Sequence, residues 1–168
     1  LLLTTAAFTM FLGVLGAVSM NSVRKILSVH IISQVGYMAL AAGLALGIGL
    51  TTDTRELAIT GGIYFIVHNM IVKTSLFLCG GLMCRYAGSD SLDHMGSLAK
   101  KAPWLGVLFM LAALSLAGLP PTSGFFGKLV LLREAMHGGY YLLAAVAIMT
   151  SVLTLLSMVK IWSYAFWN

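Results

Sequence analysis

The sequence predicts an all-α membrane protein, a bundle of five transmembrane segments whose fourth is a discontinuous helix broken at about 118–124. Of 168 residues, 60% are hydrophobic and 9% are charged, whereas a soluble domain is usually about 25% charged. The mean hydropathy is +0.97. The apolar residues form five segments that are long enough to cross a bilayer, which takes about 20 residues. A stretch rich in proline and glycine interrupts the fourth of these segments.

Short polar connections separate the five segments and set their expected bounds. The spans are expected at about 2–20, 26–49, 57–84, 104–136 and 140–166. The third is longer than a crossing needs, so we expect it to tilt or to protrude. Residues 1–168 read as a single transmembrane domain. The chain opens without Met or a basic leader and closes inside a hydrophobic segment, which predicts a fragment of a longer subunit.

The charges of the loops predict an orientation, because cytoplasmic loops carry an excess of Lys and Arg. The loops after the first and third spans hold Arg24, Lys25, Arg85, Lys100 and Lys101. The second and fourth spans are followed or ended by only Arg55 and Arg133. We therefore expect loops 21–25 and 85–102 to be cytoplasmic, with the first residue outside and the last inside.

The second span carries a polar stripe along one face. His30, Ser33, Gln34 and Tyr37 follow one another at i, i+3, i+4 and i+7, which places them together on a helix. In lipid such a face must meet protein or water. Hydrogen bonding between helices is one explanation. Proton passage is another, because histidine titrates near neutral pH.

The third span contains a lysine far from either end. An ammonium group at that depth costs a few kcal/mol, and no acidic residue lies nearby. Asn69 and Lys73 share a helix face, and His68 lies about 100° to one side of Asn69. Desolvation disfavours the charged form of a lysine, so Lys73 can release its proton. The alternative is a structural lysine that is bonded permanently to backbone carbonyls.

The fourth span contains the stretch AGLPPTSG. Pro120 and Pro121 have no N–H, and their rings clash with the preceding turn, while Gly118 and Gly124 flank them. Neither half is long enough to cross alone, so we expect one crossing with a break near its middle. Irregular backbone at that depth occurs where protein buries it or water reaches it. With Lys128 following, a broken helix that lines an ion route is the favoured interpretation. A proline kink with a snorkelling lysine is the alternative.

Several other functions are not indicated. The sequence has no nucleophile–base set, phosphate loop, metal-ligand cluster or redox motif, so no catalytic residue, metal or cofactor is expected. The net charge of +5 comes from scattered residues and does not predict nucleic-acid binding. Cys79 and Cys84 lie about 140° apart on one helix, which predicts two small core residues. Groups that can release their charge suit a proton path better than an anion channel.

Three segments resemble the proton-translocating, antiporter-like membrane subunits. They are RKILSVHIISQVGYM (24–38), HNMIVKTSLFLCGG (68–81) and LSLAGLPPTSGFFGK (114–128). That family includes the large antiporter-like subunits of complex I and the Mrp-type multisubunit sodium/proton antiporters. The segments keep the family's order and distances. The sequences of the segments are most similar to those of the Mrp-type members, because complex I relatives tend to have Tyr-Ser or Tyr-Thr where ILSVHIISQ has its histidine.

The resemblance implies about a third of a fourteen-helix subunit, namely helices nine to thirteen in the second of two inverted repeats. Lys128 matches the family's proton-carrying lysine on its discontinuous helix, and Lys73 matches the lysine of the preceding helix. The implied function is proton translocation across the bacterial cell membrane, within a secondary antiporter that exchanges sodium for protons. Expected partners are the other subunits, protons, sodium and the lipid bilayer, and neither ATP nor a redox cofactor is implied.

The chain departs from the family pattern in two places. Ser22 stands where an acidic residue commonly precedes the basic pair, and Asn69 stands where relatives often have a second histidine. We expect His68 to substitute for that histidine. The predicted proton path then runs through Lys73, Lys128, His68 and His30, with both histidines relaying protons from the cytoplasmic side.

Two alternatives to antiport stay open. In the first, the chain is part of a proton-pumping subunit of an NADH:quinone oxidoreductase or a membrane-bound hydrogenase complex, where redox energy drives transport. A purely structural membrane scaffold would transport nothing.

Overall fold

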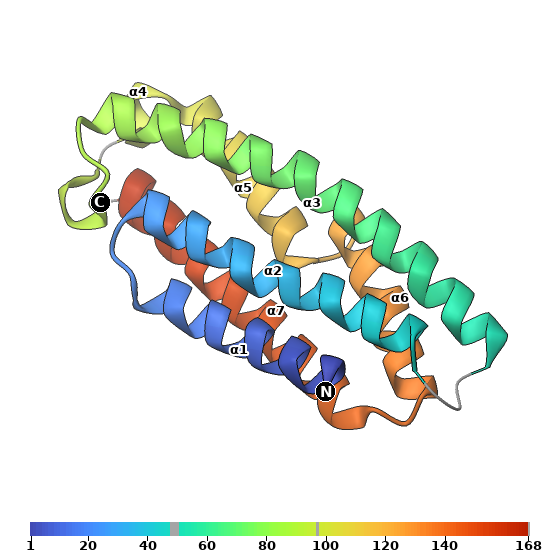
Figure 1. Ribbon diagram of the computed structural model, residues 1–168. Helices are drawn as coiled ribbons and strands as arrows, with labels where there is room; N and C mark the ends of the chain where they lie inside the picture. The colour runs from blue at the N-terminus through green and yellow to red at the C-terminus, as the bar shows by residue number, and fades with distance from the viewer. Residues whose placement is uncertain (48–50, 97, 168) are drawn as a thin grey trace.

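A computed structural model describes residues 1–47, 51–96 and 98–167, and Figure 1 shows its helices. In order they are α1 (Leu2–Ser19), α2 (Val23–Ala45), α3 (Thr52–Ala87), η1 (Leu92–His94), α4 (Leu98–Lys101), α5 (Pro103–Ala117), α6 (Ser123–His137), α7 (Tyr141–Trp162) and η2 (Ser163–Trp167). η1 is a 3₁₀ turn and η2 a π-helical turn. No β-strand occurs within these ranges, and the predicted all-α class is confirmed.

Five segments of the bundle are suited to crossing a membrane. Four are continuous: α1, α2, α3 and the run from α7 into η2. The remaining crossing, the fourth along the chain, consists of α5 and α6, which have 15 residues each and are too short to cross alone. The discontinuous fourth segment predicted from the sequence is therefore confirmed.

The helix bounds differ from the predicted spans mainly at α3. This helix has 36 residues and begins before residue 57 and ends after residue 84. Thr51 caps its start with its side chain, and Gly88 ends it with φ at 74°. These capping residues set the ends of the helix, whereas hydropathy identifies only its apolar centre. Residues 48 and 49 of the second predicted span lie outside the described residues.

The helices run along a common long axis in Figure 1. α1 packs against α2 and α7, while α3 packs against α2, α5 and α6. Glycine allows the closest of these contacts. A Cβ at Gly13 would lie 2.7 Å from the backbone nitrogen of Ser33, and a Cβ at Gly36 would lie 2.7 Å from that of Met10. Small residues at such positions let membrane helices approach closely.

The interior consists of two apolar clusters. One contains residues such as Ile26, Leu76 and Phe109 and also holds Cys79 and Cys84. The other contains residues such as Met10, Leu40 and Phe65. Along α2, α3, α5, α6 and α7, buried polar side chains occur between the residues of these clusters. This polar layer comprises His30, Ser33, Gln34, His68, Asn69, Lys73, Ser115, Lys128, Thr150, Thr154 and Ser157.

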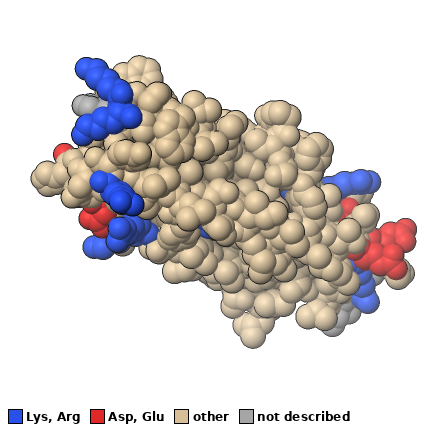
Figure 2. Space-filling view, turned by 90° about the horizontal axis from the view of Figure 1, so that it is seen from above, with Lys and Arg blue, Asp and Glu red and all other residues tan. Residues whose placement is uncertain are grey.

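On the face that Figure 2 shows, the charged side chains gather at the two ends of the molecule, and the surface between them is almost free of charge. The two predicted basic loops lie at the same end. The backbone N–H of Val23 donates to the Asp90 carbonyl at 3.0 Å, and the backbone N–H of Leu92 donates to the Asn21 carbonyl at 2.9 Å. Lys160 Nζ also donates to Asn21 Oδ1 at 2.9 Å. We call the end of the molecule that holds residues 21–25, 90–92 and Lys160 the basic end. Its location in the cytoplasm stays a prediction.

Candidate functional site

The break between α5 and α6 leaves two backbone acceptors without their usual partners. Gly118 ends α5 in the left-handed conformation, with φ at 83°. In an unbroken helix the carbonyls of Leu116 and Ala117 would accept from the N–H groups four residues later. Those positions are Pro120 and Pro121, which have no N–H. The double proline therefore leaves two carbonyls inside the bundle without a backbone donor.

Lys128 on α6 donates to these two carbonyls. Its side chain is 7% exposed, and Nζ lies 2.9 and 3.0 Å from the two carbonyl oxygens and 3.2 Å from Ser151 Oγ on α7. Nζ also lies 4.8 Å from the ring centre of Tyr37 on α2, within the range of a cation–π interaction. The Tyr37 hydroxyl lies 2.9 Å from Ser151 Oγ. Protein groups from α2, α5 and α7 thus replace water around the ammonium.

His68 on α3 lies at the same break. Its Nδ1 lies 3.0 Å from Ser123 Oγ at the start of α6, and that hydroxyl lies 3.3 Å from Ser115 Oγ on α5. Gly124 makes this approach possible. A Cβ there would overlap the carbonyl oxygen of Ser115 and lie 2.8 Å from His68 Nε2. The first turn of α6 therefore contacts His68, and Lys128 lies about one turn further along the same helix.

Lys73 on α3 is less well satisfied. It is 8% exposed, and Nζ donates to the carbonyl of Leu27 on α2 at 3.3 Å. Among the described residues this is its one hydrogen-bond partner, whereas Lys128 has three. An ammonium has three N–H groups, and a buried donor without an acceptor is costly. Lys73 therefore needs water, or it needs to give up its proton.

The geometry around His30 assigns its ring protons. His30 is fully buried, and its Nε2 contacts Ser157 Oγ on α7. The Ser157 hydroxyl donates its hydrogen to the Thr154 carbonyl at 2.9 Å, so it accepts from His30 Nε2–H. His30 Nδ1 is buried and has no partner in the described part of the chain. The neutral ring thus presents an open position that can accept a proton.

Further polar atoms of the layer also lack partners within the described ranges. They are Ser33 Oγ, both amide atoms of Gln34, Asn69 Oδ1 and Thr150 Oγ1. Burying an amide or a hydroxyl without a hydrogen bond costs roughly 2–7 kcal/mol. Buried water commonly satisfies such groups. We therefore expect ordered water in the polar layer.

The structure places all four predicted path residues in the polar layer. No hydrogen bond joins either histidine to either lysine within ranges 1–47, 51–96 and 98–167. His68 lies at the break rather than between the basic end and Lys73. Of the supporting residues, Tyr37 reaches Lys128.

The fifth segment contributes a polar face that is absent from the predicted set of site residues. Thr150, Thr154 and Ser157 follow one another at i, i+4 and i+7, and Ser151 lies beside them. The spacing template that identifies the stripe of the second span would have identified this one as well. Glu134 on α6 is also absent from the predicted set, although it is only 3% exposed.

Comparisons with known proteins give consistent matches. The family described as NADH:quinone oxidoreductase/Mrp antiporter, TM, matches residues 1–154. A D-type Na(+)/H(+) antiporter subunit of Alkalihalophilus pseudofirmus is 50% identical over 168 residues, which is 100% of this chain and 32% of the relative. The protein of the same name in Bacillus subtilis is 35% identical over the same shares. The chain thus spans about a third of the length of these curated relatives.

Two solved structures resemble the fold. The Mrp complex from Dietzia sp. DQ12-45-1b aligns with a TM-score of 0.88 and 41% identity, over 98% of this chain and 29% of that one. The membrane-bound sulfane sulfur reductase, an archaeal respiratory membrane complex, aligns with a TM-score of 0.83 and 21% identity, over 98% of this chain and 32% of that one. The second likeness concerns the fold alone.

Proposed function

The chain belongs to the NADH:quinone oxidoreductase/Mrp antiporter transmembrane family, and on that basis we propose that it moves protons as part of the D-type subunit of a sodium/proton antiporter. The relatives at 50% and 35% identity are named antiporter subunits, which supports antiport over the redox-driven alternative. The bacterial cell membrane is the proposed location, with the basic end inside. The proposed partners are the other subunits of the complex.

One structural arrangement supports this proposal over the alternative functions. The break supplies the acceptors that hold Lys128, and the same helix begins beside His68. A purely structural lysine would use the same carbonyl acceptors, but it would not need a titratable histidine at the start of its helix. A group that carries a proton needs acceptors for its charged form and a neighbouring donor or acceptor for the transfer. The broken helix provides both in one place.

The proposed route starts at the basic end. His30 accepts a proton at Nδ1 and passes it through water to Lys73. A charge on Lys73 disfavours a charge on Lys128, because like charges repel strongly where water is scarce. Lys128 then releases its proton toward the opposite end. Each step is reversible, and when sodium leaves the cytoplasm the protons pass along the same residues in the other direction, toward the basic end. His68 is placed beside Lys128 in this route rather than before Lys73, because it lies at the break.

Sodium drives this movement in the proposed cycle. Each elementary charge that crosses 100 mV is worth about 2.3 kcal/mol, so coupling to ion gradients needs no ATP or redox cofactor. Everted membrane vesicles that contain the complete complex test this directly. After respiration has acidified the vesicle interior, added sodium should dissipate the pH difference, and vesicles without the complex should show no such response. Proton uptake that requires a quinone reductant and ignores sodium would instead support the redox-driven alternative.

Gly124→Ala should lower sodium-dependent proton movement by roughly tenfold, because a side chain there displaces α6 and small misplacements of a reacting group are costly. The obstacle is the Ser115 carbonyl, a backbone atom that cannot rotate away. Gly81→Ala is the matched control, since a Cβ at Gly81 meets nothing within 4 Å. Both variants are compared at equal amounts of assembled complex. Equal rates for the two variants would show that the close approach at Gly124 is unimportant.

A further inference from the structure

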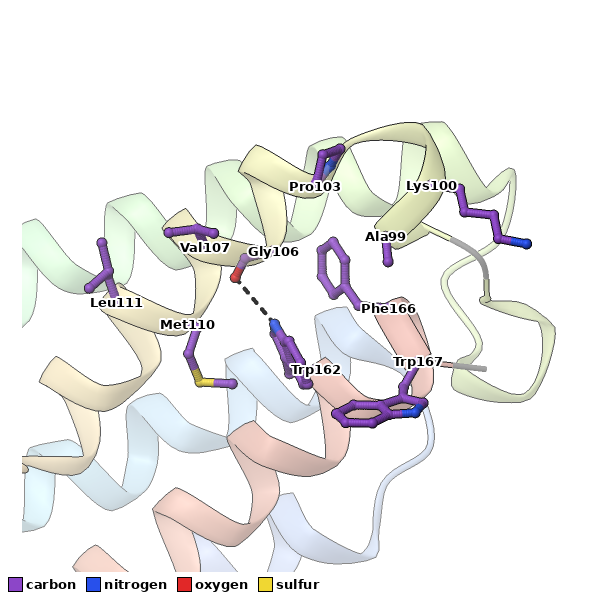
Figure 3. Close-up of a pocket in the computed structure, with 10 residues that line it drawn as sticks. All are labelled: Ala99, Lys100, Pro103, Gly106, Val107, Met110, Leu111, Trp162, Phe166 and Trp167. Atoms are coloured by element: carbon purple, nitrogen blue, oxygen red, sulfur yellow. Dashed lines mark hydrogen bonds between the residues drawn. The ribbon is translucent and has the colours of Figure 1, made fainter.

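An aromatic groove of about 700 Å³ lies at the basic end, between α4, α5 and the end of α7 (Figure 3). Trp162 fixes one wall, because its Nε1 donates to the Gly106 carbonyl at 3.2 Å. The ring of Trp162 stacks on Phe166 with centroids 6.1 Å apart and meets the edge of Trp167 at 5.9 Å. The groove is therefore preformed by mutual packing of its own side chains.

The other wall is an apolar face of α5. Val107, Met110 and Leu111 recur at i, i+3 and i+4, the spacing of one helix face, and all three line the groove. Val107 is 61% exposed and Leu111 is 57% exposed. At 1.5 Å per residue, the wall from Pro103 to Leu111 runs about 12 Å along α5. Such a wall suits part of a hydrocarbon chain that lies along the helix.

A single charge lies at the mouth of this groove. Lys100 is the charged residue among the described residues that line it, and no carboxylate accompanies it. Its side chain extends at the outer end of the groove in Figure 3. Tryptophan and lysine are the residues that membrane proteins place at the level of lipid headgroups. A ligand with an anionic head and an apolar tail would complement both parts of the groove.

We propose that this groove binds an anionic phospholipid, with its phosphate at Lys100 and an acyl chain along Val107, Met110 and Leu111. A second groove on α5, which Trp104 lines, has no charged residue among its described lining residues. It provides an internal comparison, because it offers apolar surface without the ammonium. The anionic lipid should therefore prefer the groove with Lys100 over the groove with Trp104.

Fluorescence quenching in the reconstituted complete complex tests this proposal. Vesicles of phosphatidylcholine receive increasing fractions of brominated phosphatidylglycerol or brominated phosphatidylcholine, and bromine quenches an indole on contact. The contribution of Trp167 is the difference between the wild type and Trp167→Phe. We expect phosphatidylglycerol to quench it at about fivefold lower mole fraction, which corresponds to about 1 kcal/mol for one lysine near an anionic lipid. The contribution of Trp104, from Trp104→Phe, should show no preference.

Two lysine variants separate a site from general surface charge. Lys100→Gln should remove the preference at Trp167, and Lys25→Gln, which changes an exposed lysine at the same end, should leave it. Loss of the preference in both variants would show surface attraction only and would overturn the proposal. Equal quenching by the two lipids would overturn it as well. Absence of quenching at Trp167 would show that protein covers the groove, and the proposal would be wrong.

Discussion

Lys128→Ala should abolish sodium-dependent proton movement, with a loss of roughly a hundredfold or more, the usual contribution of a positioned proton-transfer group. The variant removes the one side chain that donates to both carbonyls exposed by the double proline. No other ionisable group in the described part of the chain is bonded to those carbonyls. Lys128→Arg should fail nearly as completely, because arginine keeps its charge but does not release a proton.

Everted vesicles with matched amounts of assembled complex provide the measurement for both variants. Lys25→Gln is the control, since it removes an exposed lysine at the basic end and should leave transport near the wild-type rate. A Lys128→Ala complex that assembles and transports like the wild type would favour a structural scaffold. Normal transport by Lys128→Arg alone would mean that the position requires a fixed charge rather than a releasable proton.

The break in the fourth segment was predictable because its cause is local. Pro120 and Pro121 remove two donors, and the carbonyls that lose them are fixed by helix geometry to lie four residues earlier. The same local logic explains the family resemblance, which the match over residues 1–154 confirms. The second of the three family segments, 68–81, which includes Lys73, is likewise recognisable from its local sequence. Within this segment His68, Asn69 and Lys73 are buried.

The contacts across the bundle were not predictable in the same way. His30 meets Ser157, which lies 127 positions away in the chain, and Lys128 meets Ser151, which lies 23 positions away. Periodicity shows which side chains share a helix face, but it does not show which helix that face meets. The placement of His68 at the break, rather than nearer the basic end, depends on this missing information.

The polar face of α7 is recognisable from its spacing, but its role is not predictable from the sequence, for a different physical reason. Serine and threonine in a helix often bond to their own backbone, as Thr154 does with the Thr150 carbonyl at 2.7 Å. Such residues are compatible with a lipid-facing helix, so they carry little weight in an apolar segment. Their meaning becomes clear only when His30 and Lys128 are seen to use Ser157 and Ser151 as partners.

The central claim is that the charge of Lys73 is switchable. Its ammonium has one partner among the described residues, the Leu27 carbonyl at 3.3 Å, and lies far from either end of a long helix. A lysine retained for structure should be replaceable by another permanent cation. A lysine that must lose its proton in every cycle should not be, because arginine effectively never deprotonates.

The decisive measurement is sodium-dependent proton movement in everted vesicles that carry the Lys73→Arg complex, compared with wild type and Lys73→Ala at equal assembly. The proposed route predicts that Lys73→Arg assembles normally and retains no more than about a tenth of the wild-type rate, like Lys73→Ala, because a positioned proton-transfer group has been lost. Full activity in Lys73→Arg would show that the charge at this position is structural and would contradict the proposed proton route.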